Sequence, residues 1–190
     1  MSDKESNMSW GAWMLTLALL LFGAAPMAIA ETKESDLKAA FVFNFSQFVD
    51  WPTNNFASTN SPFVIGVLGG SNDFVKTLND LVRNEKNAGH PMTVRASRSV
   101  NDLRDCEIVY IGSAEAPRMR EIMAQLRDRS VLTVSDMDDF IEQGGIIRLY
   151  TSNNKMRMKI SLDAARRSRL TISSKLLRLA EVVGQPNPDR

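Results

Sequence analysis

The chain has 190 residues and carries 23 basic against 22 acidic side chains, for a formal net charge of +1 at pH 7. This balance argues against binding of nucleic acid through bulk charge, which needs a strong basic excess. The length suits one ordinary domain with a full hydrophobic core, and a single cysteine and a single histidine rule out an intramolecular disulfide and a convincing metal site.

The first thirty residues predict a secretory signal. An uncharged apolar run over residues 11–25 precedes Ala28-Ile29-Ala30, the small-x-small pattern that signal peptidase cleaves, and a charged segment follows. The run is shorter than the roughly 20 apolar residues that a membrane span needs. We therefore expect residues 1–30 to be cleaved and the mature chain to lie in the periplasm; an uncleaved anchor in the inner membrane, facing the periplasm, is the alternative. Acidic residues near the amino terminus do not fit a signal, so translation from Met1 or from Met8 stays open.

An amphipathic helix is predicted next, followed by an alternation of strands and helices. The helix covers residues 33–49, with a stripe of Leu37, Phe41, Phe45 and Phe48. Apolar strands are predicted at residues 62–68, 91–96, 107–112 and 131–134, and helices at residues 73–83, 100–104, 117–129 and 137–142. Unbroken apolar strands joined by helices indicate a parallel sheet covered on both faces.

The pattern changes after residue 145. Strands at residues 146–150 and 155–160 flank a four-residue loop, which predicts a hairpin. The chain then closes with a predicted helix whose stripe is Ile172, Leu176, Leu179, Ala180 and Val183. The sequence thus predicts one α/β domain over residues 31–184 and a flexible tail over residues 185–190. Its fold is expected to be Rossmann-like, with a mostly parallel sheet flanked by helices, a C-terminal β-hairpin and a closing helix.

The turn Gly69-Gly70-Ser71 follows a predicted strand and opens a helix, where nucleotide-binding loops also lie. It matches neither the dinucleotide fingerprint nor the phosphate-binding P-loop. A tight structural turn is the first interpretation, and a small ligand or anion held by the amides of this helix end is the alternative. No residue set predicts a catalytic, cofactor-binding or metal site, so we expect a protein without enzyme activity and without a cofactor.

Cys106 begins a predicted buried strand, which indicates an inert core thiol. An odd cysteine in an oxidising compartment can also bridge two chains, and the sequence leaves this open.

Basic side chains are concentrated in the C-terminal third. Residues 148–178 hold nine basic groups against one acidic group, and Arg166, Arg167 and Arg169 lie close together within them. Such a cluster can attract an acidic partner or anionic lipid headgroups. Solvated faces of a hairpin and a helix explain each residue singly, so both interpretations stay open.

The first helix is rich in aromatic residues. Phe43 lies off its apolar stripe, and Trp51 adds another large ring. Core packing accounts for most of these rings. The surplus can form an exposed apolar patch for a partner or for a homodimer, so Phe43 and Trp51 are candidate contact residues.

Five segments, in this order, resemble the YfiR family of periplasmic proteins. They are LKAAFVFNFSQFVDWP (37–52), FVIGVLGGSNDF (63–74), DCEIVYIGSAE (105–115), VLTVSDMDDFIEQGGII (131–147) and ISSKLLRLAEVV (172–183). The resemblance implies a mixed α/β fold and a non-catalytic regulator. It further implies binding to the periplasmic domain of an inner-membrane diguanylate cyclase, which the chain would repress, lowering cyclic di-GMP and biofilm formation.

The sequence leaves other partners possible, and it differs from the best-known family member in its cysteine content. A sensor kinase is an equal candidate partner, and a small-molecule binding module that feeds such a kinase is the alternative function. The best-known family member is linked to redox control through disulfides, and one cysteine, Cys106, cannot form a disulfide switch within one chain.

Overall fold

A computed structural model describes residues 25–184 except residues 57 and 59. Most of the predicted signal peptide, residues 1–24, and the predicted tail, residues 185–190, lie outside this part. The chain divides into two compact units at Glu34 and Ser35. All described strands belong to the second unit. No helix among the described residues combines the length and the apolarity that a membrane crossing requires.

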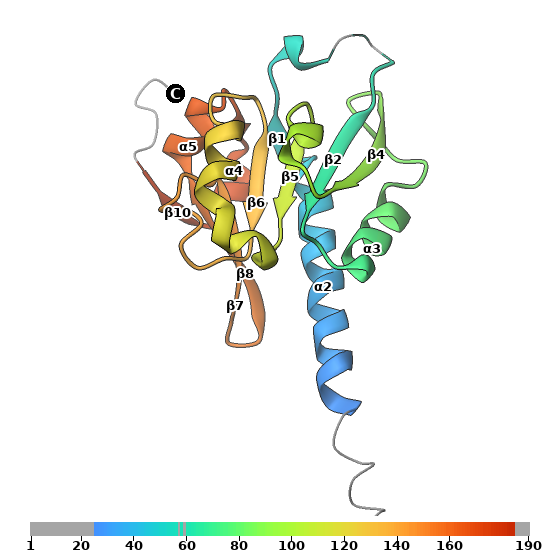
Figure 1. Cartoon of the computed structure of the whole chain (residues 1–190). Coiled ribbons are helices and arrows are strands. Elements are labelled where there is room, and N and C mark those ends of the chain that lie inside the picture. Colours follow the sequence, from blue (N-terminus) through green and yellow to red (C-terminus); the bar gives the residue numbers. More distant parts are fainter. Residues whose placement is uncertain (1–24, 57, 59, 185–190) are drawn as a thin grey trace, which may run out of the picture. The chain divides into compact units, whose positions relative to one another are not determined.

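Eight strands form one sheet (Figure 1). They are β2 (Phe63–Leu68), β3 (Lys86–Asn87), β4 (His90–Ser97), β5 (Ile108–Ile111), β6 (Leu132–Ser135), β7 (Ile147–Ser152), β8 (Lys155–Ser161) and β10 (Glu181–Val183). Their order across the sheet is β10-β8-β7-β6-β5-β2-β4-β3. The neighbours from β4 to β7 are parallel, and antiparallel pairs occur at β7–β8 and β3–β4. The predicted α/β class with a mostly parallel sheet is therefore confirmed, and its five central strands have the doubly wound order 2-1-3-4-5.

Helices cover both faces of this sheet. They are α2 (Ala25–Phe45), α3 (Asn72–Val82), α4 (Met119–Leu126), α5 (Leu162–Arg167) and α6 (Ser174–Leu177), with short 3₁₀ helices at Thr53–Asn55, Val100–Leu103 and Ser113–Arg118. Side chains of a strand alternate between its two faces, and β2 serves two cores in this way. Phe63, Ile65 and Val67 pack with residues of α2 and α3, whereas Val64 and Leu68 pack with residues of α4.

Helices α3 and α4 each bury one apolar face. The buried residues are Phe74, Leu78 and Val82 in α3 and Met119, Ile122 and Leu126 in α4, while Leu81 and Met123 are partly buried beside them. The Ser71 hydroxyl caps α3 by accepting a hydrogen bond from the amide of Phe74, 3.2 Å away. Helix α4 ends three residues earlier than predicted, because the backbone becomes extended at Arg127, with ψ of 141°, and left-handed at Asp128, with φ of 61°.

The predicted extent and stripe of the first helix are both corrected. Helix α2 ends at Phe45, and a turn leads into β1 (Val49–Asp50), which pairs with β9 (Thr171–Ile172) in a separate two-stranded sheet. Within the second unit, the buried face of α2 carries Ala39, Val42 and Phe45, while Leu37 is 44% exposed. The pairing of β1 with β9 thus outweighs the helical periodicity of residues 46–49, which is a tertiary effect.

The predicted helix over residues 137–142 is a series of turns. Phe140 is fully buried in the core under α4, and a Cβ on Gly145 would lie 2.3 Å from the Phe140 ring. The backbone at Gly145 therefore passes so close to this ring that only glycine fits there. The hairpin is confirmed, but its loop is the two-residue turn Asn153-Asn154, with φ of 52° and 57°, which matches the twist of the flanking strands.

The closing helix is also corrected. After α5 the chain forms β9, the one-turn helix α6 and β10, a parallel partner of β8 at the edge of the sheet. Leu176 is buried as predicted, but Leu179 is 71% exposed. The apolar residues of this segment have the spacing of a helix stripe, which is why a helix was predicted. Residues 181–183 form a strand instead because they pair with β8.

Candidate functional site

The strand order reverses between β2 and β5, and ligands of doubly wound folds usually bind there, at the carboxyl ends of the strands. Here that point is filled by the chain itself. The amide of Gly112, which follows β5, donates to the carbonyl oxygen of Leu68 at 2.8 Å. A Cβ on Gly112 would lie 2.2 Å from the carbonyl oxygen of Gly69. The two loops are therefore in direct backbone contact.

The predicted ligand turn, Gly69-Gly70-Ser71, lies at this edge. A Cβ on Gly69 would lie 2.8 Å from a carboxylate oxygen of Glu115, so the Glu115 side chain packs directly on the turn. The Ser71 hydroxyl is already engaged as the cap of α3. An anion at these amides would meet the Glu115 carboxylate, and the arrangement favours a structural role; ligand binding by the turn stays a prediction.

The two aromatic candidates, Phe43 and Trp51, are half-buried and pack against the core. The Trp51 ring meets Phe63 edge-on at a centroid distance of 5.0 Å. Its indole nitrogen donates to the carbonyl oxygen of Glu107 at 3.0 Å. Trp51 thus attaches the loop after β1 to the sheet. Both residues pack within the domain, and contact with a partner through their exposed parts stays a prediction.

The three basic candidates lie at and after the end of α5. Arg166 pairs with Asp163, one turn earlier in the helix. Arg167 is exposed and lines a hollow of about 320 Å³. Arg169 has a left-handed backbone, with φ of 57°, and donates to the Ser130 hydroxyl at 3.3 Å and to the Asp128 carbonyl oxygen at 3.4 Å. Arg167 and Arg169 therefore lie beside the loop before β6. A second set of arginines, from other parts of the chain, lies at the same edge of the sheet.

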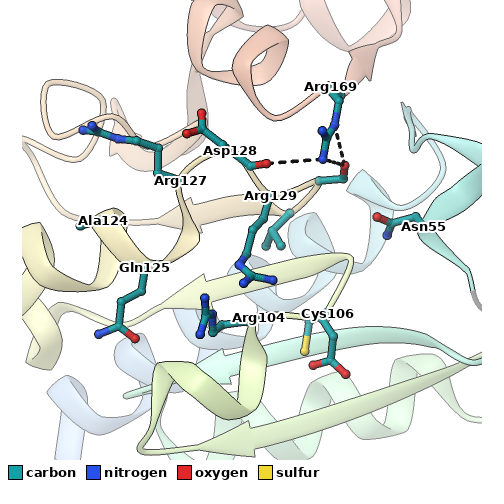
Figure 2. Close-up of a pocket in the computed structure, with 12 residues that line it drawn as sticks. Asn55, Arg104, Cys106, Ala124, Gln125, Arg127, Asp128, Arg129 and Arg169 are labelled. Carbon is teal, nitrogen blue, oxygen red and sulfur yellow. Dashed lines mark hydrogen bonds between the residues drawn. The ribbon is translucent and has the colours of Figure 1, made fainter.

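This second group lines a larger hollow of about 590 Å³ (Figure 2). Its wall consists of Asn55, Arg104, Asp105, Cys106, Ala124, Gln125, Arg127, Asp128, Arg129, Ser130, Val131 and Arg169. Most of these residues directly precede β5 or β6, so the hollow lies at the amino edge of the parallel strands. Four arginines face two aspartates in this wall, which gives it an excess of positive charge. We call it the amino-edge pocket.

Glu107 lies behind this pocket and joins three parts of the chain. Its side chain is 2% exposed and accepts hydrogen bonds from the amide of Val64 at 2.6 Å and from the Asn55 side chain at 3.1 Å. Burial raises the pKa of the Glu107 carboxyl above its ordinary value, against the opposing effect of these hydrogen bonds. Glu107 thus fastens the loop that carries Trp51 and Asn55 to β2 and β5.

Cys106 is 1% exposed, and burial raises the pKa of its thiol to about 12. The thiolate is the reactive form. We expect Ellman's reagent at pH 8 to react with the folded protein about a thousandfold more slowly than with an ordinary thiol. In denaturant, one thiol per chain should react at once. Rapid, complete modification without denaturant would show that the thiol is accessible, as a disulfide between two chains would require.

The sequence analysis did not identify the pocket arginines Arg104, Arg127 and Arg129, because they lie in two separate segments of the chain. The sequence does contain a signal that could have identified them. Arg104-Asp105 precedes one apolar strand and Arg127-Asp128-Arg129 precedes the next. The amino ends of neighbouring parallel strands meet at one edge, so charges before consecutive strands converge there.

Within residues 25–56, 58 and 60–184, no three His, Cys, Asp or Glu side chains gather where they could hold a metal ion. The guanidinium groups that line the amino-edge pocket are suited to hydrogen bonding and charge recognition of carboxylate or phosphate groups.

The sequence model of the YfiR/HmsC-like family matches residues 35–181. This span runs from within α2 to the first residue of β10 and includes every strand between them. No protein of curated function matches the sequence.

Solved structures with a similar fold include a conserved domain protein from Vibrio cholerae O1 biovar El Tor, with a TM-score of 0.50 and 12% identity. They also include an ABC domain in complex with L-Trp from Streptococcus pneumoniae, with a TM-score of 0.52 and 12% identity. The matches cover 79% and 77% of this chain, respectively, and 60% of each of the other chains. At this identity the likeness extends to the α/β fold alone.

Proposed function

Because the chain belongs to the YfiR/HmsC-like family, we propose that it is a non-catalytic periplasmic regulator that binds the periplasmic region of an inner-membrane diguanylate cyclase. In the bound state it holds the cyclase inactive and so lowers cyclic di-GMP and biofilm formation. The observation that carries the proposal is the family match over residues 35–181, which spans the domain from α2 to β10. The predicted export signal supports the same compartment.

The charge of the amino edge supports an acidic contact surface on the partner. Arg127 and Asp128 line both hollows at this edge, the smaller one together with Arg167 and the larger one together with Arg169. Arg127 and Arg167 are exposed, and no described residue pairs with either side chain. Unpaired exposed arginines steer the approach of an acidic partner and contribute to its orientation.

Deletion of the gene tests the direction of regulation. We expect cyclic di-GMP and biofilm mass to rise in the deletion strain and to return to the parental values when the wild-type gene is restored. Unchanged cyclic di-GMP, together with affinity capture from detergent-solubilised envelopes that recovers no membrane sensor protein, would contradict the proposal.

Charge reversal tests the surface. We expect R167E together with R169E to reduce recovery of the membrane partner several-fold, because two attractive charges become repulsive. R120E is the matched control, since Arg120 is exposed, lies on α4 and contacts neither hollow. Adding R166E should have a smaller further effect because Arg166 already pairs with Asp163. Equal recovery with R120E and with the double reversal would assign these arginines to solvation.

A second candidate function is favoured by the 590 Å³ pocket: a periplasmic small-molecule binding module that feeds a sensor kinase. It predicts that a membrane kinase is the protein captured and that deletion leaves cyclic di-GMP unchanged while altering phosphorylation of the kinase. Capture of a cyclase with a matching rise in cyclic di-GMP would exclude it. The partner itself therefore separates the two functions.

A further inference from the structure

Arg104 and Arg129 occupy a special position at the amino edge. Both line the amino-edge pocket and also the neighbouring hollow of about 580 Å³, and together with Asp105 they form the wall between the two. Each side chain is half-buried. Figure 2 shows their guanidinium groups pointing toward one another inside the pocket. Two like charges are thus held side by side in a partly desolvated place.

The carboxylates of the two hollows are directed elsewhere. Asp105 pairs with Arg95 at 2.9 Å, and Asp102 accepts a hydrogen bond from the Ser97 hydroxyl at 2.7 Å. The carboxylate of Asp128 points away from the two guanidinium groups in Figure 2. Among the described residues, the Arg129 side chain has no hydrogen-bond or ion-pair partner. Within the described part of the chain, no carboxylate therefore forms an ion pair with Arg104 or Arg129.

Hydrogen-bonding capacity is also left over. The Nε of Arg104 is buried without a partner, and the one hydrogen bond from its Nη1, to Asn101, is long at 3.4 Å. The Oε1 of Gln125, in the same wall, is likewise buried and unpartnered. Buried polar groups are nearly always satisfied in folded proteins, so unsatisfied groups gathered in one pocket call for an outside partner.

We propose that Arg104 and Arg129 bind the carboxylate or phosphate group of a small molecule in the amino-edge pocket. A planar guanidinium presents paired donors that match the oxygens of either group, and an anion between two guanidinium groups neutralises their repulsion. Gln125 and Arg169 lie farther along the wall, where they can contact the rest of the ligand. The proposal concerns a ligand of the domain itself and does not depend on the identity of the membrane partner.

Thermal unfolding and isothermal titration calorimetry test this site with two probes, inorganic phosphate and citrate, at constant ionic strength set with sodium chloride. The protein used is the one recovered from the cells that express the full gene, with or without cleavage of the predicted signal peptide. We expect at least one probe to raise the unfolding temperature and to bind with measurable heat. R104Q and R129Q should each weaken that binding at least tenfold, whereas R120Q, an exposed arginine outside the pocket, should bind like the wild type.

The two probes separate the possible sources of the ligand. Preference for phosphate indicates a phosphorylated metabolite or free phosphate, and preference for citrate indicates a carboxylic acid. A second readout needs no ligand: R129Q alone should unfold at the same or a higher temperature than the wild type, because it removes a like-charge contact. No stabilisation by either probe, or equal stabilisation of R120Q and of both pocket variants, would overturn the proposal.

Discussion

Replacing Gly112 with alanine is expected to prevent stable folding. A Cβ at this position would lie 2.2 Å from the carbonyl oxygen of Gly69 and 2.7 Å from its carbonyl carbon. Both are backbone atoms, so no side chain can rotate to make room. The backbone of Gly112 is ordinary, with φ of −71°, and the cost comes wholly from the close approach of the two loops.

We expect the free energy of unfolding to fall by about 4 kcal/mol or more, the range of severe overpacking. Circular dichroism during thermal unfolding and the yield of soluble protein measure this loss. G89A is the matched control, because Gly89 has φ of +91° and a Cβ there would meet nothing within 4 Å. That variant isolates backbone strain, worth about 1–2 kcal/mol. If G112A unfolds no more easily than G89A, the two loops do not touch as described.

The second large effect is expected at Glu107. Replacing it with alanine leaves the buried amide of Val64 without an acceptor and releases Asn55. We expect a loss of about 2–4 kcal/mol, from the unsatisfied amide and the cavity together. Midpoints of unfolding in urea measure it. E107Q is the isosteric control, since one amide oxygen can still accept from Val64, and it should stay within about 1 kcal/mol of the wild type at pH 7.

The same pair of proteins has a defined pH dependence. Because the pKa of Glu107 is raised in the folded state, chiefly by burial, the folded protein binds this proton more tightly than the unfolded chain does. Its stabilising contribution is therefore fully present below the unfolded pKa of about 4.3 and is lost as the pH rises through the folded pKa. E107Q lacks this proton, so its stability relative to the wild type should increase over that interval. A difference that is constant from pH 4 to pH 7 would contradict the charge burial.

Local sequence patterns sufficed for much of the fold. Residues 63–68 form an unbroken apolar run, and such a run is buried on both faces wherever it lies in a parallel sheet. Phe74, Leu78 and Val82 recur at helical spacing within the helix predicted over residues 73–83, and they form its buried face. These successes share one cause, because the periodicity of a strand or helix is written within a few consecutive residues.

The predictions were wrong where pairing with a distant segment determines the local structure. Val49 continues a helical pattern, but it pairs with Ile172, more than a hundred residues away. Residues 181–183 extend an apolar stripe, but their pairing with β8 makes them a strand. The amino-edge pocket has the same origin, since Arg104, Arg129 and Arg169 meet only after the parallel strands have stacked. The pattern within one segment does not specify which distant segment it will pair with, so the pocket can be found only by comparing the residues that precede consecutive strands.

The strand order also determines when each strand can pair during folding. β2 is completed at Leu68, yet the strands that flank it end at Ser97 and Ile111. Until these later segments are available, the fully buried strand β2 has neither of its partners, and a chain that needs such distant pairings folds slowly. Until they pair, residues 63–68 are the segment most exposed to aggregation, because unpaired apolar strands readily associate with one another.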